Sequence, residues 1–345
     1  MEDLTLIIGA GASHELGLPL GSTLKDKIRT ALSTKDYSTG LSGYFENNRI
    51  GSALHLLAEE SHADGSEVFD AARRIGIGIN HAISIDNLID SHRGDKLIEA
   101  TGKISIVECI ASAEQHSRLA LVTNLSKDFM GIDNCWLSPF VSRLFENCHW
   151  SNLCERLSRI CFIIFNYDRC VEHYLLNAII SHYGSTADEA AALLNNVSFI
   201  HPYGTIGRLP WQVGSGDGMD FGSMPQGYQL LALSKQIRTF TEQKADDEKL
   251  EELRRKVAYS KRVVFLGFAY HKINMQLLQL ADEDRQKSTS SRPTIGTAFG
   301  MSKADIDIVT HELKWLRASA EDPTIRPDLE CRNVFTEYSR SLSFA

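Results

Sequence analysis

The stretch Leu4-Thr5-Leu6-Ile7-Ile8-Gly9-Ala10-Gly11-Ala12-Ser13 decides the fold of this chain. A mainly apolar run that ends in Gly-x-Gly is typical of a buried parallel strand whose carboxyl end meets the start of a helix. Glycine lets the backbone turn sharply, and a helix start offers unpaired N–H groups that suit a diphosphate. The dinucleotide-binding fingerprint has a third glycine where this chain has His14. A tight strand-to-helix turn with no ligand is therefore the alternative interpretation.

The composition bounds the class of protein. The chain has 345 residues, so we expect one large domain with an insertion, or two domains. With 43% hydrophobic and 23% charged residues, it has the composition of a soluble globular protein. The net charge of −8 argues against direct nucleic-acid binding through general electrostatic attraction, although it leaves room for a local basic patch.

Membrane spans, signal peptides and metal sites are not indicated by the sequence. No apolar stretch approaches the roughly 20 residues that span a bilayer, and the first residues lead directly into a core strand. We therefore expect a cytoplasmic protein that does not associate with membranes. The seven cysteines include no Cys-x-x-Cys pair, which argues against a structural zinc site, so no metal is expected.

Further strand patterns alternate with helical ones along the chain. A continuous apolar run at residues 160–165 and shorter strand patterns at 196–200, 262–266 and 293–297 predict four more strands. Residues 40–150 contain few β-branched runs and predict a mostly helical insertion within a single unit that covers residues 1–345. The pattern indicates an α/β protein with a Rossmann-like parallel sheet and helices on both faces. In such sheets, ligands lie beyond the carboxyl ends of the strands.

Polar residues and glycine follow these strands where a ligand would lie. Asn166 and Asp168 come after the second predicted strand, His201 after the third, and Gly267 and Phe268 after the fourth. An Asn–Asp pair can hold a sugar hydroxyl, a carboxamide or a water, or it can cap the following helix. A histidine at such an edge can act as a general base near neutral pH, or it can be a satisfied core residue. We expect these groups to converge on one crevice.

Other catalytic motifs are absent from the sequence. The Gly-x-Ser-x-Gly turn of serine hydrolases does not occur, nor does a Walker A loop. His, Asp and Glu residues do not fall in a recognised metal-ligand spacing.

Taken together in their order, six segments resemble the sirtuin-like NAD-binding family found in bacterial anti-phage defence. The segments are Gly9-Ala10-Gly11-Ala12-Ser13 with Gly17 and Pro19, Ser84-Ile85-Asp86-Asn87-Leu88, Phe165-Asn166-Tyr167-Asp168, His201-Pro202-Tyr203-Gly204, Val264-Phe265-Leu266-Gly267-Phe268-Ala269-Tyr270 and Gly296-Thr297-Ala298-Phe299-Gly300. The resemblance spans nearly the whole chain. It departs from the protein deacetylases of this fold, which carry a four-cysteine zinc ribbon that this chain lacks. Pro202 and Tyr203 also separate the histidine and the glycine that are adjacent in the family.

The resemblance implies an NAD glycohydrolase that releases nicotinamide and leaves ADP-ribose. It implies that Asn166 positions the attacking water and the ribose, that Asp168 supports the nicotinamide side, and that His201 is the base. It also implies a set of NAD-binding residues: Gly9, Ala10, Gly11, Ser13, Gly267 and Phe268. Activity would wait for a trigger, through a homo-oligomer or a separate partner such as a HerA-type ATPase. The alternatives are a catalytically silent sensor of NAD or an ADP-ribose derivative, and an NAD-dependent protein deacylase.

Overall fold

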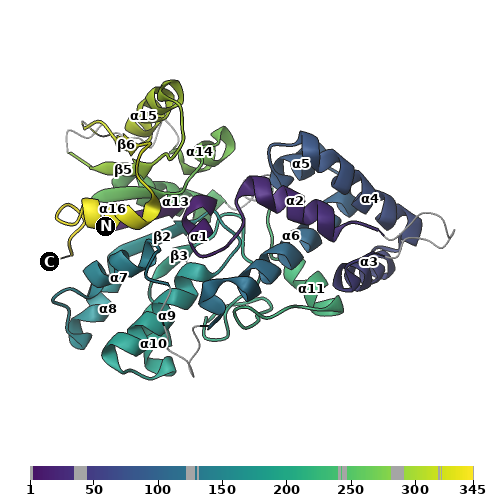
Figure 1. Cartoon of the computed structure of the whole chain (residues 1–345), viewed down its shortest axis with the longest axis horizontal. Helices are drawn as coiled ribbons and strands as arrows, with labels where there is room; N and C mark the ends of the chain where they lie inside the picture. The colour runs from purple at the N-terminus through teal and green to yellow at the C-terminus, as the bar shows by residue number, and fades with distance from the viewer. Residues whose placement is uncertain are drawn as a thin grey trace.

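A six-stranded parallel sheet forms the centre of the protein, as the computed structural model shows (Figure 1). The structure describes residues 3–34, 45–121, 129, 132–239, 242, 247–280, 291–317, 319 and 321–344. The strands are β1 (Leu4–Ile8), β2 (Ile160–Ile164), β3 (Ser198–Ile200), β4 (Arg262–Leu266), β5 (Thr294–Thr297) and β6 (Thr324–Arg326). The predicted α/β class with a Rossmann-like parallel sheet is confirmed. The sequence did not predict β6, which has three residues and lies at the sheet edge.

The strand order is β3-β2-β1-β4-β5-β6, and β1 lies where the order reverses. From β1 the chain builds the sheet outward through β2 and β3, and it then returns to the other side of β1 for β4, β5 and β6. Ile8 pairs with Ile164 of β2 and with Leu266 of β4, so these three strands end at the same level. The turns after β1, β2 and β4 therefore meet beyond one edge, where open α/β sheets bind ligands.

Two hydrophobic cores cover the two faces of the sheet, because successive strand residues point to opposite sides. Ile7, Ile163 and Phe265 belong to one core, and Leu6 and Phe162 belong to the other. The helices are α1 (Ala10–His14), α2 (Gly21–Ala31), α3 (Asn48–Ser61), α4 (Gly65–Gly78), α5 (Ile85–Ser91), α6 (Lys96–His116), α7 (Leu137–Phe145), α8 (Trp150–Ser158), α9 (Cys170–Tyr183), α10 (Ala187–Leu194), α11 (Gly227–Ser234), α13 (Asp247–Tyr259), α14 (Lys272–Leu278), α15 (Lys303–Arg317) and α16 (Cys331–Glu337).

A helical lobe extends to one side of the sheet (Figure 1). It contains α2 to α6 together with α11, which the chain adds only after β3, and α11 packs against α3 and α6. Helix α7 also lies within the predicted insertion at residues 40–150, but it packs beside the sheet, against α9 and α16, and α8, which begins at residue 150, packs against β2. A contiguous stretch of sequence therefore contributes to both lobes.

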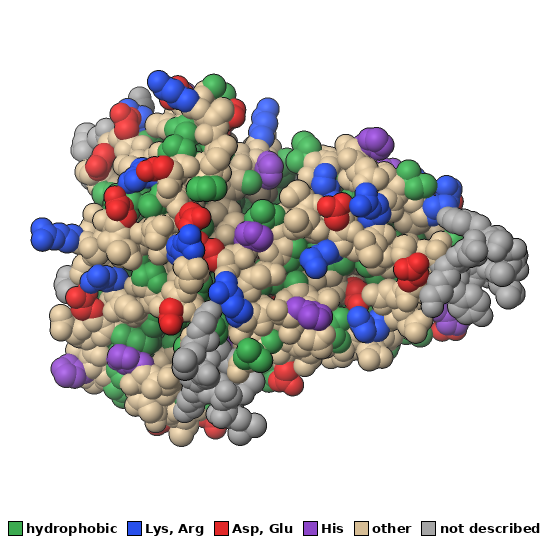
Figure 2. Space-filling view, in the orientation of Figure 1, with side chains coloured by type: hydrophobic (Ala, Val, Ile, Leu, Met, Phe, Trp, Pro, Cys, Tyr) green, Lys and Arg blue, Asp and Glu red, His purple; other side chains and the backbone are tan. Residues whose placement is uncertain are grey.

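The surface in Figure 2 shows a notch between the two lobes at the top of the view, and acidic and basic side chains are interspersed over this face. The segment at residues 205–226 is a loop that forms turns and an isolated bridge between Arg208 and Gly218. Within the described ranges, every helix falls short of the length or the apolar character that a bilayer span requires.

Candidate functional site

The turns after β1 and β4 contact each other backbone to backbone. The Gly9 N–H donates to the Leu266 carbonyl at 2.9 Å, and the Gly11 N–H donates to the Gly267 carbonyl at 3.0 Å. A Cβ on Gly9 would lie 2.5 Å from the Gly267 oxygen, and one on Gly267, where φ is +56°, would lie 2.1 Å from the Ala12 nitrogen. The close packing of the two turns therefore explains the need for glycine even when no ligand is bound, as the alternative interpretation of the β1 turn holds. The N–H groups of Gly9 and Gly11 are also already used in these contacts.

Asn166 ties the end of β2 to the β1 turn. Its Nδ2 donates to the Gly9 carbonyl at 3.0 Å and to the Ser13 hydroxyl at 2.8 Å. The Ser13 hydroxyl also bonds to Asp168, and Asp168 accepts from the Cys170 N–H at 3.1 Å at the start of α9. Asn166 is 8% exposed and Asp168 3% exposed. The structure thus brings together Ser13, Asn166 and Asp168, and of the predicted pair only Asp168 bonds to the following helix.

Asp168 lies in a poorly solvated position that alters its protonation. Burial raises the pKa of its carboxyl group, and the charge of Glu114 acts in the same direction. Hydrogen bonds from Cys170 and Ser13 oppose this shift, but the net direction is upward. The environment therefore favours the protonated carboxyl, which can donate as well as accept a hydrogen bond.

His201 has an acceptor at each ring nitrogen. Nε2 lies 2.7 Å from Oε1 of Glu172 on α9, and Nδ1 lies 3.2 Å from the backbone carbonyl of Asn166. Burial alone lowers the pKa of His201, but the charge and hydrogen bond of Glu172, helped by the Asn166 carbonyl and by Asp168, produce a net rise. A ring that donates from both nitrogens is an imidazolium, so in this geometry His201 holds a proton that a general base must first lose.

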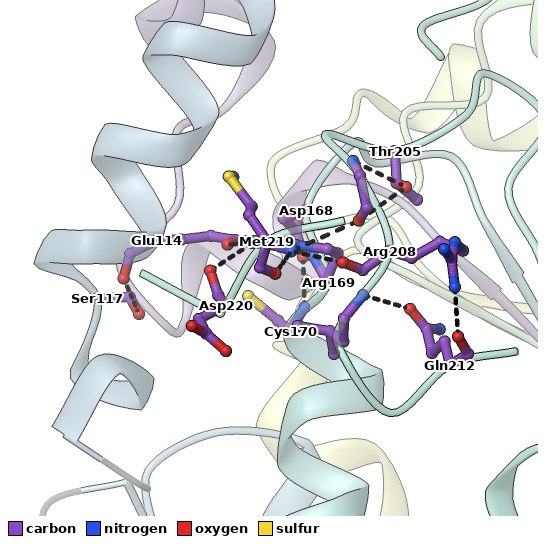
Figure 3. A network of polar contacts seen from close by, with 12 residues as sticks. Glu114, Ser117, Asp168, Arg169, Cys170, Thr205, Arg208, Gln212, Met219 and Asp220 are labelled. Atoms are coloured by element: carbon purple, nitrogen blue, oxygen red, sulfur yellow. Dashed lines mark hydrogen bonds and ion pairs between the residues drawn. The ribbon is translucent and has the colours of Figure 1, made fainter. Parts of the chain in front are cut away.

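A buried ion pair beside these residues was not predicted from the sequence. Arg169 and Glu114 are both fully buried, and the backbone N–H and Nε of Arg169 donate to Glu114 Oε1 at 3.0 and 3.2 Å. Nη1 of Arg169 also donates to the Met219 carbonyl at 2.7 Å (Figure 3). One side chain thus joins α6, the start of α9 and the 205–226 loop. The partners are 55 positions apart in the sequence, so no local pattern signals this pairing.

Tyr167 lies on the opposite side of the chain from Asn166 and contacts the helical lobe. Its hydroxyl donates to Oδ1 of Asp86 at the start of α5. Asp86 is partly buried, and desolvation raises the pKa of its carboxyl group. Two of the segments quoted for the family resemblance, residues 84–88 and 165–168, therefore meet through this hydrogen bond.

Aromatic side chains fill the space behind the β4 turn. Phe268 is 4% exposed, and its ring centroid lies 5.0 Å from that of Phe165 and 5.3 Å from that of Tyr270. The Tyr203 hydroxyl donates to Oδ1 of Asn274 on α14 at 2.7 Å. The Phe268 ring is thus a packing element here, whereas Gly267 contacts the β1 turn. Ala10 lies at the first position of α1, beside that turn.

A hollow of about 920 Å³ lies at the opposite, amino-terminal edge of the sheet. Its lining includes Asp3, Arg262 and Pro293, which directly precede or begin strands, so it is remote from the carboxyl-edge residues. Among the described side chains, no group of three or more His, Cys, Asp or Glu residues is placed to hold a metal ion. No family model matches the chain, and neither the curated proteins nor the solved structures compared with it give a match.

Proposed function

We propose that the chain binds NAD beyond the carboxyl edge of its sheet and hydrolyses the N-glycosidic bond, releasing nicotinamide and leaving ADP-ribose. One observation carries the proposal. The hydroxyl of Ser13, the amide of Asn166, the carboxyl of Asp168 and the ring of His201 form one connected set of polar groups. This set follows β1, β2 and β3 and so extends from β1, where the strand order reverses and where Rossmann-like sheets bind dinucleotides.

The chemistry of the bond suits these groups. Loss of nicotinamide leaves an oxocarbenium-like ribose, so the protein mainly positions the reactants and stabilises charge. Both hydrogens of the Asn166 amide are committed to Gly9 and Ser13, which leaves Oδ1 as the atom that can accept from a water or a ribose hydroxyl. A protonated Asp168 would donate to the nicotinamide carboxamide. His201, once it has lost its Nδ1 proton, would take the proton from the attacking water or a ribose hydroxyl.

Contact with the diphosphate is the part of the proposal that the geometry constrains most. The N–H groups of Gly9 and Gly11 already donate to the β4 end, so they do not face a phosphate in this arrangement. Gly9, Ala10, Gly11 and Ser13 would hold the diphosphate through other groups of the turn or after rearrangement. That role, and any role in anti-phage defence with a homo-oligomer or a HerA-type ATPase, rests on the family resemblance alone.

The decisive experiment measures nicotinamide release from NAD by the purified chain, alone and with the product of the neighbouring gene, without acylated peptide. We expect release that Asn166→Ala and His201→Ala both abolish. The control His55→Ala, at a histidine side chain that is 77% exposed, should leave release unchanged. Circular dichroism and thermal melting would establish that each variant is folded. Unchanged release in both site variants would refute the assignment, and a requirement for an acylated peptide would favour the deacylase.

The connected polar set also supports a second candidate, a sensor that binds NAD or an ADP-ribose derivative without consuming it. The polar side chains of the site already bond to one another and are nearly buried, which is an arrangement suited to a resting state. Calorimetry that shows NAD binding, together with no nicotinamide release under any of the conditions above, would favour the sensor over the glycohydrolase.

A further inference from the structure

Glu172 and His201 form a buried pair that the proposed reaction does not by itself explain. The side chains are 1% and 9% exposed, and the ring Nε2 lies 2.7 Å from Glu172 Oε1. The second carboxylate oxygen, Oε2, is buried and has no hydrogen-bond partner among the described residues. Buried charges are costly unless they are paired, so the carboxylate of Glu172 depends on the histidine as its counter-ion.

We propose that Glu172 is the positioning residue of His201: it holds Nε2 as a donor and leaves Nδ1 as the nitrogen that exchanges a proton with the ligand. The catalytic purpose of this proton exchange rests on the proposed function. The coupling between Glu172 and His201 is independent of that function. A carboxylate that accepts from one ring nitrogen fixes the tautomer and the orientation of the other nitrogen.

The location of Glu172 fits this task. It lies in the first turn of α9, where the helix dipole favours a carboxylate. The groups that act on the ring from the neighbouring elements are Glu172 on α9, and Asp168 and the Asn166 carbonyl at the end of β2. The guanidinium of Arg169, the nearby cation, is instead directed at Glu114. The Glu172 carboxylate and the Asn166 carbonyl therefore face the two ring nitrogens of His201, which stabilises its protonated form.

Nδ1 of His201 is hydrogen-bonded to the backbone of Asn166, whose side-chain amide belongs to the site. While protonated, it donates to the Asn166 carbonyl at 3.2 Å. If that proton is lost to solvent, the lone pair of Nδ1 faces a lone pair of the carbonyl oxygen. The two repel each other, and this repulsion favours movement of the neutral ring away from the carbonyl. The freed Nδ1 can then accept one proton from a water or a ribose hydroxyl, which regenerates the imidazolium held by Glu172. Deprotonation and access of the ring to a ligand are thus coupled.

The test compares Glu172→Gln with the full-length wild-type chain. NMR titration of ¹⁵N-histidine-labelled protein, with the His201 signal assigned through His201→Gln, reports the pKa and the tautomer of the ring without NAD. We expect Glu172→Gln to lower the pKa of His201 by about one unit or more, because the charge that opposes burial is gone. The acidic limb of the pH profile for nicotinamide release should move to lower pH by the same amount, and Glu172→Asp should restore part of the shift.

The matched control is Glu59→Gln, which alters another His–Glu pair, at 3.4 Å, whose side chains are exposed on α3. It should leave both the His201 titration and the pH profile unchanged. An unshifted His201 pKa in Glu172→Gln would overturn the inference, as would a wild-type ring whose Nε2 is unprotonated when neutral. The wild-type titration decides the matter even if Glu172→Gln does not fold. The NMR readout needs no turnover, so a shifted pKa without nicotinamide release would count against the proposed function only.

Discussion

Replacement of Gly267 by alanine tests the contact that closes the two turns. The new Cβ would lie 2.1 Å from the Ala12 nitrogen and 2.4 Å from the Gly11 carbonyl carbon, and φ at this position is +56°. The left-handed backbone costs an L-residue about 1–2 kcal/mol, and forcing an atom into a filled space costs about 1–3 kcal/mol more. Reduced freedom of the unfolded chain returns about 0.4–1 kcal/mol. We therefore expect Gly267→Ala to lower the free energy of unfolding by about 3 kcal/mol.

Two control glycines separate these contributions. Gly300 has φ of +76° with no atom within 4 Å of an added Cβ, so Gly300→Ala carries the backbone cost alone, about 1 kcal/mol. Gly76 lies in α4 with open space around it, so Gly76→Ala should stabilise the protein by about 0.5–1 kcal/mol. Urea unfolding followed by the fluorescence of the four tryptophans measures all three variants. A loss in Gly267→Ala no larger than that in Gly300→Ala would refute the close approach of the two turns.

Three further predictions concern the polar groups of the site. Arg169→Met leaves the Glu114 carboxylate buried without its partner and should cost about 3–5 kcal/mol in urea unfolding, whereas Arg73→Met, in an exposed pair with Asp70, should cost less than about 1 kcal/mol. Burial raises the pKa of Asp168, so over a range of pH the native state keeps a proton that the unfolded state has lost. The free energy of unfolding therefore falls as the pH rises from about 4 through the raised pKa. Asp168→Asn should flatten that part of a curve of stability against pH. Ser13→Ala removes an acceptor of the Asn166 amide and should cost about 1–3 kcal/mol, and an unchanged unfolding midpoint would show that this hydrogen bond is absent in solution.

The sheet could be predicted because its signal is local. Residues 4–8, 160–164 and 262–266 are mainly apolar, and the structure forms strands from each of them. The three-residue strand β6 carries no such run, since Thr324 is exposed and only Ile325 is buried. The set of helices that forms the helical lobe could not be predicted from the sequence either. Helix α11 follows β3 in the chain, yet it belongs to this lobe because it packs against α3 and α6.

The candidate site was predictable as a set of strand ends but not as a set of bonds. Parallel strands that end at one level bring Gly9, Asn166 and Gly267 together, and the sequence pattern indicates this much. The partners of Asn166 and His201 depend instead on side-chain directions within a few ångströms. Glu172 resembles any acidic residue in a first helical turn, so the sequence offered no sign that it would bind His201.

The polar groups at the carboxyl edge satisfy each other, and this has a consequence for any ligand that binds there. Asn166 makes two side-chain hydrogen bonds within the protein, and His201 makes two more. A net worth of about 1 kcal/mol each means that a ligand which displaced two of them would give up about 2 kcal/mol, or roughly a thirtyfold loss of affinity. A partner or assembly step that separated these groups beforehand would remove that penalty. Control by such a step therefore requires no change in the chemistry of the site, only a shift in how often its internal hydrogen bonds are broken.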